Sequence, residues 1–310
     1  MTATLPTKTR TYRNHMLDSE RWLQIERRPD DIIIATPYKC GTTWMQTIVM
    51  HLIFQDLKPR QVDEVSRWVD AAPIPIKDLR AVLDAQTHRR VLKSHLPMNG
   101  FYYRAEDKMI VVGRDPRDVF MSFWNHYAGY TDVAYAKHND WPGRPGAPLP
   151  PCPDTIRELW SMWISRGWFD WESEGYPFWS NLHHVQTWWR HRDLPNILLV
   201  HYNDLLADLN GGIARIAHFL NINCSDEMRA AITEKTTFAS MKRDAADVAA
   251  DPDGMFAGGA KQFINKGTNG RWRSVLTADD LAAYDRTAAR ELSPDCRAWL
   301  EAIDSRAICI

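Results

Sequence analysis

Four short apolar runs stand out along the chain as candidate buried strands. They read DIIIA (31–35), RVLKS (90–94), MIVVG (109–113) and NILLVHY (196–202). Runs of this length with little polar alternation are typical of strands that are covered on both faces. We therefore predict a parallel sheet built from these four segments.

Helical patterns lie between the runs and after them. Residues 42–57 are apolar nearly all round, and helical patterns also cover 117–127, 205–222 and a Trp-rich stretch at 154–192. Strands that alternate with helices favour an α/β fold of three layers around a central parallel sheet. In such folds the binding loops lie at the carboxyl ends of the strands.

Two segments are predicted loops. Residues 141–153 contain six prolines, which exclude a helix or a central strand. Residues 250–270 contain five glycines and are predicted to form a mobile surface segment. Because no linker-like stretch divides the chain, we predict a single domain over residues 1–310 with its core at about 30–290.

Composition excludes several classes of partner. The net charge is -1, so no overall field favours nucleic acid or an anionic membrane, and an anion site has to be built locally. The N-terminus lacks the apolar core of a signal peptide, and no apolar run approaches the about 18 residues that span a bilayer. We predict a soluble, cytoplasmic protein.

The cysteines indicate a reducing compartment. They are scattered, odd in number and without a C-x-x-C pair, which favours free thiols over a disulfide framework or a zinc site. They are Cys40, Cys152, Cys224, Cys296 and Cys309.

The segment TPYKCGTTW (36–44) follows the first predicted strand and is the first candidate anion site. Gly41 permits a tight turn into a helix whose first N–H groups lack internal partners and therefore face an anion. Thr42 and Thr43 add hydroxyl donors, and Lys39 adds a charge. The usual phosphate loop places its Lys after the last Gly, so this loop is P-loop-like rather than a P-loop. The alternative is that a Thr merely caps the helix.

A second strand–loop–helix unit reads VGRDPRDVFMSFW. Arg114 ends the strand, Pro116 presets the helix, and Ser122 lies about two turns further on, within reach of the same phosphate. Alternatively, Arg114 pairs with Asp115 or Asp118 and Ser122 only packs. Two anion loops at neighbouring strand ends predict a ligand with two separated anionic groups.

A third candidate, NKGTNGRW (265–272), ends the Gly-rich segment. Lys266, placed before Gly267, would close over a phosphate from outside the sheet. The alternative is an ordinary surface turn.

His95 is the one histidine that ends a predicted strand, in LKSHLP. A histidine held there suits general base catalysis near neutral pH, taking a proton from an acceptor hydroxyl. Three further histidines, His183, His184 and His191, lie on a predicted helix without a carboxylate or a third ligand, so we interpret them as structural.

The side chains at the ends of the predicted strands are cationic. Magnesium-dependent phosphoryl transfer calls for an acidic metal ligand at the end of another strand. The second run ends instead in Lys93-Ser94-His95, and the third ends in Gly113-Arg114. We therefore predict a site that handles an anion without a metal.

Taken together, these motifs resemble the cytosolic sulfotransferase family. TPYKCGTTW, KSHLP, RDPRDVFMS and NKGTNGRW occur in the family's order, and LLVHYND and KTTFASM resemble two further family segments. The resemblance spans about residues 30–290. It implies transfer of a sulfuryl group from 3'-phosphoadenosine 5'-phosphosulfate (PAPS) to a hydroxyl or amine, leaving adenosine 3',5'-bisphosphate (PAP), with no metal.

The resemblance also assigns roles to residues. His95 is implied as the base, Lys39 as the cation on the leaving phosphate, and Lys93 as a contact of the sulfuryl oxygens. The implied nucleotide-binding set holds the 5' end, the 3'-phosphate and the adenine, with Trp44 and Phe238 on the two faces of the adenine and Tyr202 and Thr236 near its edge. It consists of Lys39, Cys40, Gly41, Thr42, Thr43, Trp44, Arg114, Ser122, Tyr202, Thr236, Phe238, Asn265, Lys266 and Gly267.

Two of these positions depart from the family pattern. Cys40 replaces a serine that contacts the nucleotide, which removes a good hydroxyl donor. Asn265 replaces an arginine that binds the 3'-phosphate, so donor affinity is weaker or another cation, Lys261 or Arg271, compensates. The family's dimer motif is largely missing, so the oligomeric state is left open.

Aromatic residues predict a bulky acceptor. Most of the 14 tryptophans lie between residues 124 and 189 and, with Phe101 and Tyr102, would line an apolar acceptor pocket. The alternative is that they pack helices against the sheet. We expect a small-molecule or lipid-like acceptor such as a phenol, sterol or glycolipid, with acceptor or lid regions at 130–195 and 245–265.

Two rival functions remain open. A nucleotide or small-molecule kinase of the P-loop type predicts magnesium-dependent ATP turnover and a carboxylate that ends a strand. A non-catalytic nucleotide-binding protein would bind 3'-phosphoadenosine compounds, and the change His95→Ala would cost it no function.

Overall fold

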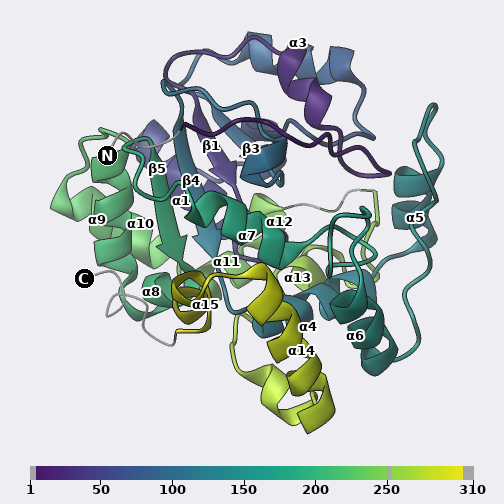
Figure 1. Cartoon of the computed structure of the whole chain (residues 1–310). Coiled ribbons are helices and arrows are strands. Elements are labelled where there is room, and N and C mark those ends of the chain that lie inside the picture. The colour runs from purple at the N-terminus through teal and green to yellow at the C-terminus, as the bar shows by residue number, and fades with distance from the viewer. Residues whose placement is uncertain (1–4, 250, 252, 303–310) are drawn as a thin grey trace.

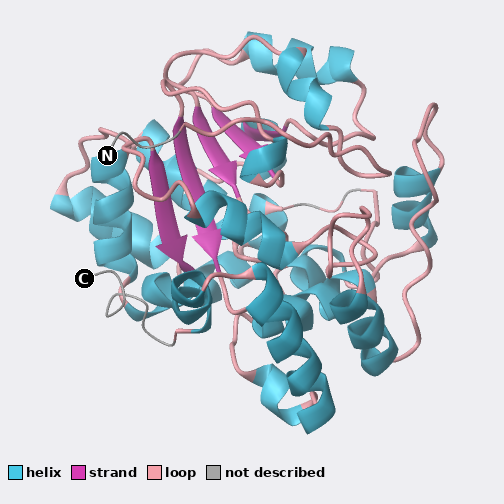
Figure 2. Cartoon of the chain, viewed as in Figure 1, coloured by secondary structure: helices cyan, strands magenta, loops and turns pink. Residues whose placement is uncertain are grey.

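The computed structural model describes residues 5–249, 251 and 253–302, so Cys309 lies outside the described residues. Its centre is a five-stranded sheet in the order β2-β3-β1-β4-β5, in which every pair is parallel (Figures 1 and 2). The strands are β1 (Ile32–Ala35), β2 (Ser66–Trp68), β3 (Val91–Ser94), β4 (Lys108–Gly113) and β5 (Ile197–His201). The predicted α/β fold and its four strands are confirmed.

Alternate strand residues enter two different cores, which makes the fold three-layered. Ile33 and Ala35 of β1 belong to one core, and Ile32 and Ile34 belong to the other. Because side chains alternate along a strand, each core forms on one face of the sheet. One face packs on α1 (Thr42–Phe54), α8 (Tyr202–Ala207), α9 (Leu209–Phe219) and α10 (Asp226–Lys235). The other packs on α3 (Ile76–Ala85), α4 (Pro116–Tyr127), α6 (Ile156–Ser165), α7 (Asn181–Trp189), α14 (Ala278–Glu291) and α15 (Pro294–Glu301).

Shorter elements complete the described chain. The helices are α2 (Val62–Val65), α5 (Asp132–Asn139), α11 (Phe238–Arg243), α12 (Ala245–Val248) and α13 (Gly259–Phe263), and the 3-10 turns are η1 (Ser19–Leu23), η2 (Met98–Gly100) and η3 (Arg271–Ser274). Residues 141–153 contain neither helix nor strand, as their prolines predicted. None of the described helices combines the length and apolar character that crossing a membrane requires.

Two sequence predictions about elements were wrong in detail, and one strand was missed. The helix predicted at 205–222 breaks at Asp208, whose carboxylate caps α9 by accepting the Gly211 N–H (2.8 Å). The Trp-rich stretch is two helices, α6 and α7, joined by irregular residues 166–180. Strand β2 was missed because Ser66 and Arg67 give it no apolar run, and as an edge strand it pairs only with β3.

The sheet register sets the site. Ala35 of β1 pairs with Ser94 of β3, and the Thr36 N–H donates to the Ser94 carbonyl (3.1 Å). Both strands therefore end at the same edge, which places the loop after β1 beside His95. Helix α1 starts from that loop, and α4 starts just after β4 ends.

Candidate active site

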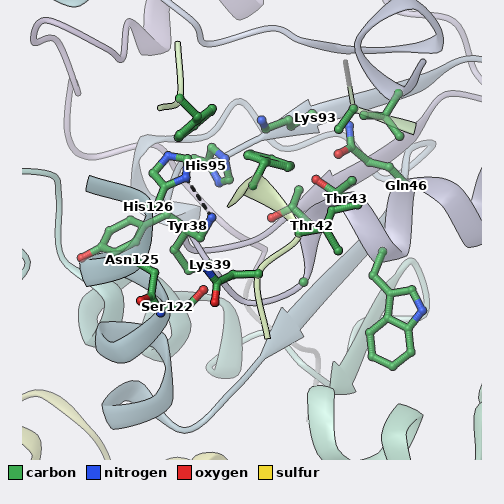
Figure 3. A pocket seen from close by; sticks show the side chains of 18 of the residues that line it. Tyr38, Lys39, Thr42, Thr43, Gln46, Lys93, His95, Ser122, Asn125 and His126 are labelled. Carbon is green, nitrogen blue, oxygen red and sulfur yellow. Dashed lines mark hydrogen bonds between the residues drawn. The ribbon is translucent and has the colours of Figure 1, made fainter. Parts of the chain in front are cut away.

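A cavity of about 580 Å³ opens at the carboxyl edge of the sheet. Figure 3 shows Lys39, Lys93, His95 and Ser122 around it, and these residues come from the loop after β1, the end of β3 and helix α4. The predicted site residues that line it are Lys39, Gly41, Thr42, Thr43, Trp44, Lys93, His95, Arg114, Ser122, Tyr202, Phe238, Asn265, Lys266 and Gly267. Cys40 and Thr236 belong to the predicted set but do not line it.

The loop after β1 turns through two left-handed residues. Lys39 has a φ of 62° and Gly41 a φ of 94°, a region in which glycine is the favoured residue. Helix α1 starts at Thr42 without a side-chain cap, because its N-cap residue is Gly41, and the Thr42 hydroxyl lies 2.6 Å from that of Thr36. The N–H groups of the first turn therefore remain available to an anion.

Lys39 is desolvated among other cations. Its Nζ lies 3.1 Å from Nδ1 of His126 and 4.9 Å from the ring centre of Phe263. Desolvation in the cavity, followed by the charges of Lys93 and Arg114, lowers the pKa of the Lys39 ammonium to about 7. An anion in the cavity would favour the charged form again.

His95 is held as a neutral base. Its Nδ1 lies 2.6 Å from the Thr36 carbonyl oxygen, which can only accept, so Nδ1 carries the proton and Nε2 keeps its lone pair. Burial, and then the charge of Lys93, lower the pKa of His95 well below its ordinary value. The ring therefore stays neutral at pH 7, as a proton acceptor requires.

Asp70 is a strand-end carboxylate that the sequence did not reveal, because β2 was missed. Its oxygens accept from the His95 backbone N–H (3.0 Å) and from the indole N–H groups of Trp22 (3.2 Å) and Trp68 (2.9 Å). It does not line the cavity. Asp70 thus positions the strand end that carries His95.

Arg114 joins the first anion loop to the third. Its guanidinium donates to the Lys39 carbonyl (3.2 Å) and to Oδ1 of Asn269 (2.7 and 3.1 Å), and it lies over the Tyr202 ring. Asp115, one of its two alternative partners, pairs with Arg117 and caps α4. The other, Asp118, accepts the Gly270 N–H (2.7 Å).

The third loop carries the position that departs from the family. Oδ1 of Asn265 is buried without a hydrogen-bond partner in the described chain. Of the two cations expected to compensate, Arg271 lines the cavity and Lys261 does not. Arg271 donates to the Met121 carbonyl (3.2 Å), and its Nε has no partner among the described residues.

Two of the aromatic residues predicted to bind adenine, Trp44 and Tyr202, lie together at the cavity. The Trp44 indole N–H donates to the Thr236 carbonyl (2.7 Å), and its ring meets Tyr202 edge-on at 5.3 Å. Thr236 is the C-cap of α10, and its hydroxyl donates to the Ile232 carbonyl of that helix (2.8 Å). Thr236 therefore contributes to this end of the site only through its backbone carbonyl, which holds the Trp44 ring.

The Cys40 thiol points into the core. It is fully buried and lies 3.9 Å from Nδ2 of Asn181, and burial raises its pKa to about 12. Cys40 does not line the cavity, so the structure gives no support to its predicted contact with a nucleotide.

Most of the aromatic residues that were predicted to line the acceptor pocket do not line the cavity. Phe101 is fully buried, 4.7 Å from the Trp22 ring, and neither Phe101 nor Tyr102 lines the cavity. Among the tryptophans of the 124–189 stretch, Trp179 alone lines it; the others were mostly needed to pack helices. The apolar wall is formed instead by Met16, Trp68, Ile74, Phe178, Trp179, Met255, Phe256 and Phe263.

Sequence reasoning missed His126. It lies on α4 four residues after Ser122, and residues so spaced share one face of a helix. Applying that spacing to the predicted helix would have brought His126 to the cavity that Ser122 lines.

Comparisons with known proteins identify the family of the chain. A family model described as Sulfotransferase domain matches residues 29–294. A glycolipid sulfotransferase of Mycobacterium bovis is 30% identical over 310 residues, covering 93% of each chain. Human sulfotransferase 2B1 is 28% identical over 271 residues, covering 86% of this chain and 67% of that protein.

Solved structures share the fold. The mouse sulfotransferase SULT7A1 complexed with PAP superposes with a TM-score of 0.69 at 20% identity, covering 97% of this chain and 100% of that one. Retinol dehydratase in complex with androsterone and inactive cofactor PAP gives 0.67 at 22% identity, covering 90% and 87%.

Proposed function

The chain belongs to the sulfotransferase domain family, and from that premise we propose that it moves a sulfuryl group from PAPS to a hydroxyl or amine of an apolar acceptor. The observation that carries this proposal is the convergence of Lys39, Lys93 and His95 on one cavity. A proton acceptor and two cations at one cavity support in-line transfer, which needs a base at the acceptor and cations where negative charge grows.

The cavity's charge fits a doubly anionic donor. Its described lining holds seven lysine and arginine side chains against the two carboxylates of Asp63 and Asp251. PAPS, when bound, supplies the activated sulfuryl group. The first loop, with Lys39, would hold its 5' end, and Arg114, Ser122 and Lys266 would hold its 3'-phosphate.

Each polar side chain then has a defined task. Nε2 of His95 takes the proton of the acceptor hydroxyl. The Lys39 ammonium stabilises the charge that grows on the leaving phosphate, and Lys93 orients the sulfuryl oxygens. Lys93 lies 4.5 Å from the Trp68 ring centre, which restrains it at the end of β3.

The acceptor end supports a lipid-like substrate. Apolar side chains such as Ile74, Phe178, Trp179 and Phe256 line it, and relatives of similar length are named glycolipid sulfotransferases. A long apolar alcohol would bury its chain against this wall and present its hydroxyl to His95.

The test compares His95→Ala with His218→Ala, an exposed histidine of α9. Calorimetric titration with PAP should give unchanged affinity for both variants. Transfer from radiolabelled PAPS to a panel of phenols, sterols and glycolipids should fall by at least about 100-fold in His95→Ala only.

Two results would contradict the proposal. Tighter binding of ATP than of PAP would favour the kinase alternative. Equal turnover in the two histidine variants would exclude His95 as the base.

A further inference from the structure

His126 contacts the cation on which the proposed reaction depends. Its Nδ1 lies 3.1 Å from Nζ of Lys39, the contact drawn as a dashed line in Figure 3. The two residues come from different elements, α4 and the loop after β1. The spacing from Ser122 brings His126 to the cavity, but nothing in the sequence shows that it contacts Lys39.

The direction of this hydrogen bond follows from its neighbours. A charged lysine can only donate, so Nδ1 of His126 accepts, and the ring's proton lies on Nε2. Nε2 lies 3.1 Å from the Tyr130 hydroxyl, and burial raises the pKa of that phenol, so its neutral oxygen is the acceptor. The chain of donors therefore runs from Lys39 through His126 to Tyr130.

Aromatic rings fix His126 in place. The rings of Tyr130, Phe256 and Phe263 lie 5.2, 4.8 and 5.8 Å from it. Phe263 also lies 4.9 Å from Nζ of Lys39, so one α13 side chain covers both partners. An imidazole packed in this way presents its lone pair with little freedom.

The other charges around Lys39 oppose its protonation. Lys93 on β3 and Arg114 at the end of β4 both act on it, and His95 and His138 also act on His126. Desolvation and Lys39 itself lower the pKa of His126 well below its ordinary value, so the imidazole stays neutral beside the ammonium. His126 thus supplies the acceptor that favours the charged form of Lys39.

We propose that His126 is a positioning residue for sulfuryl transfer: its Nδ1 holds one N–H of Lys39 and leaves the other two for the leaving phosphate. This inference rests on the proposed function. In the step it serves, a bond forms from the acceptor oxygen to sulfur, and the bond from sulfur to the phosphate oxygen breaks. The electron pair stays on that phosphate oxygen, facing Lys39, and the acceptor proton moves to Nε2 of His95.

The test begins with the protein free of nucleotide. His126→Phe removes the acceptor, whereas His126→Asn keeps an oxygen near the position of Nδ1. The reactivity of the Lys39 amine toward acetic anhydride, measured by peptide mass spectrometry across pH, reports its protonation. We expect its midpoint to fall by about one pH unit in His126→Phe and to stay near the wild-type value in His126→Asn.

Kinetics give the second measurement. The midpoint of the alkaline limb of kcat/KM for PAPS should fall by the same amount, about one pH unit, in His126→Phe. At pH 8 the value of kcat/KM should therefore be about 10-fold lower in His126→Phe and near the wild-type value in His126→Asn. Equal midpoints in all three proteins, or a shift in His126→Asn as large as in His126→Phe, would overturn the proposal.

A measurement on the wild-type chain tests the inference even if the variants fail to fold. Nitrogen-15 NMR of the wild-type histidines at about pH 6, where Lys39 is mostly charged, should show His126 protonated on Nε2, and a proton on Nδ1 there would overturn the inference. The titration and the NMR spectrum use no donor, so a chain that transfers no sulfuryl group at all can still give the expected Lys39–His126 coupling. The failure of the proposed function is thereby distinguished from the failure of this inference.

Discussion

At the residue scale, Lys39 has to carry a charge in a place that disfavours charge. Its ordinary pKa of 10.5 is lowered to about 7 by desolvation and by Lys93 and Arg114. Near neutral pH a substantial share of the free protein therefore has a neutral Lys39. An anionic ligand reverses this, because it stabilises the ammonium.

We predict that PAP binding takes up a proton above pH 7. At pH 8 the free protein has mostly lost the Lys39 proton and the complex regains it, so affinity falls by up to about 10-fold per pH unit. Calorimetry in buffers of different ionisation enthalpy measures the uptake. Lys39→Ala should abolish it, and Lys261→Ala, outside the cavity lining, should not; uptake that persists in Lys39→Ala would contradict this account.

Arg271 is the cation that we expect to compensate for the asparagine at position 265. It lines the cavity beside Arg114, and its Nε lacks a partner among the described residues. We predict that Arg271→Ala weakens PAP binding by about 10-fold, the loss of one charge-assisted hydrogen bond. Arg273→Ala, whose exposed side chain lies over Trp272, is the matched control. Equal affinities in the two variants would remove Arg271 from the site.

At the scale of elements, the site is made of strand ends and the loops that leave them. Gly267 in the third loop has a φ of 62°, and a Cβ there would lie 2.3 Å from the Phe238 ring. The loop thus packs directly against a predicted adenine contact at the start of α11.

We predict that Gly267→Ala displaces Phe238 and lowers PAP affinity by about 10-fold or more. Gly254→Ala separates this clash from backbone strain, because Gly254 has a similar φ of 67° and nothing within 4 Å of its Cβ position. Both variants carry the cost of a left-handed alanine, about 1 kcal/mol. Titration with PAP should therefore distinguish them, and equal loss of affinity would show that strain alone acts.

At the scale of the whole molecule, the cavity gathers residues from distant parts of the chain. Met16 and Ile264 both line it, as do residues of β3, α1, α4 and α11. A ligand that bridges these parts binds the folded chain only, so it must stabilise the whole fold.

We predict that PAP at about 100 times its Kd raises the Tm by about 4 °C, since this excess contributes about 2.7 kcal/mol. His95→Ala should keep the shift, because His95 is not a nucleotide contact in the proposed scheme. Arg114→Ala should lose most of it. Differential scanning calorimetry with PAP and with ATP measures these shifts, and an equal shift with ATP would contradict the predicted selectivity.

The sequence by itself determined the layered fold and the first anion loop. The apolar runs, the Gly41 turn and the His95 strand end are local signals, in which backbone geometry and side-chain type act over a few residues. The polar edge strand β2 was missed because it is held by pairing with β3 rather than marked by an apolar pattern of its own, and Asp70, which follows it and accepts from Trp22 and His95, was missed with it.

Only the tertiary structure decided which side chains meet. It turned the Cys40 thiol into the core, brought Arg271 rather than Lys261 to the cavity, and set His126 against Lys39. These outcomes depend on how helices pack across the sheet edge, and such contacts join residues that no local pattern links.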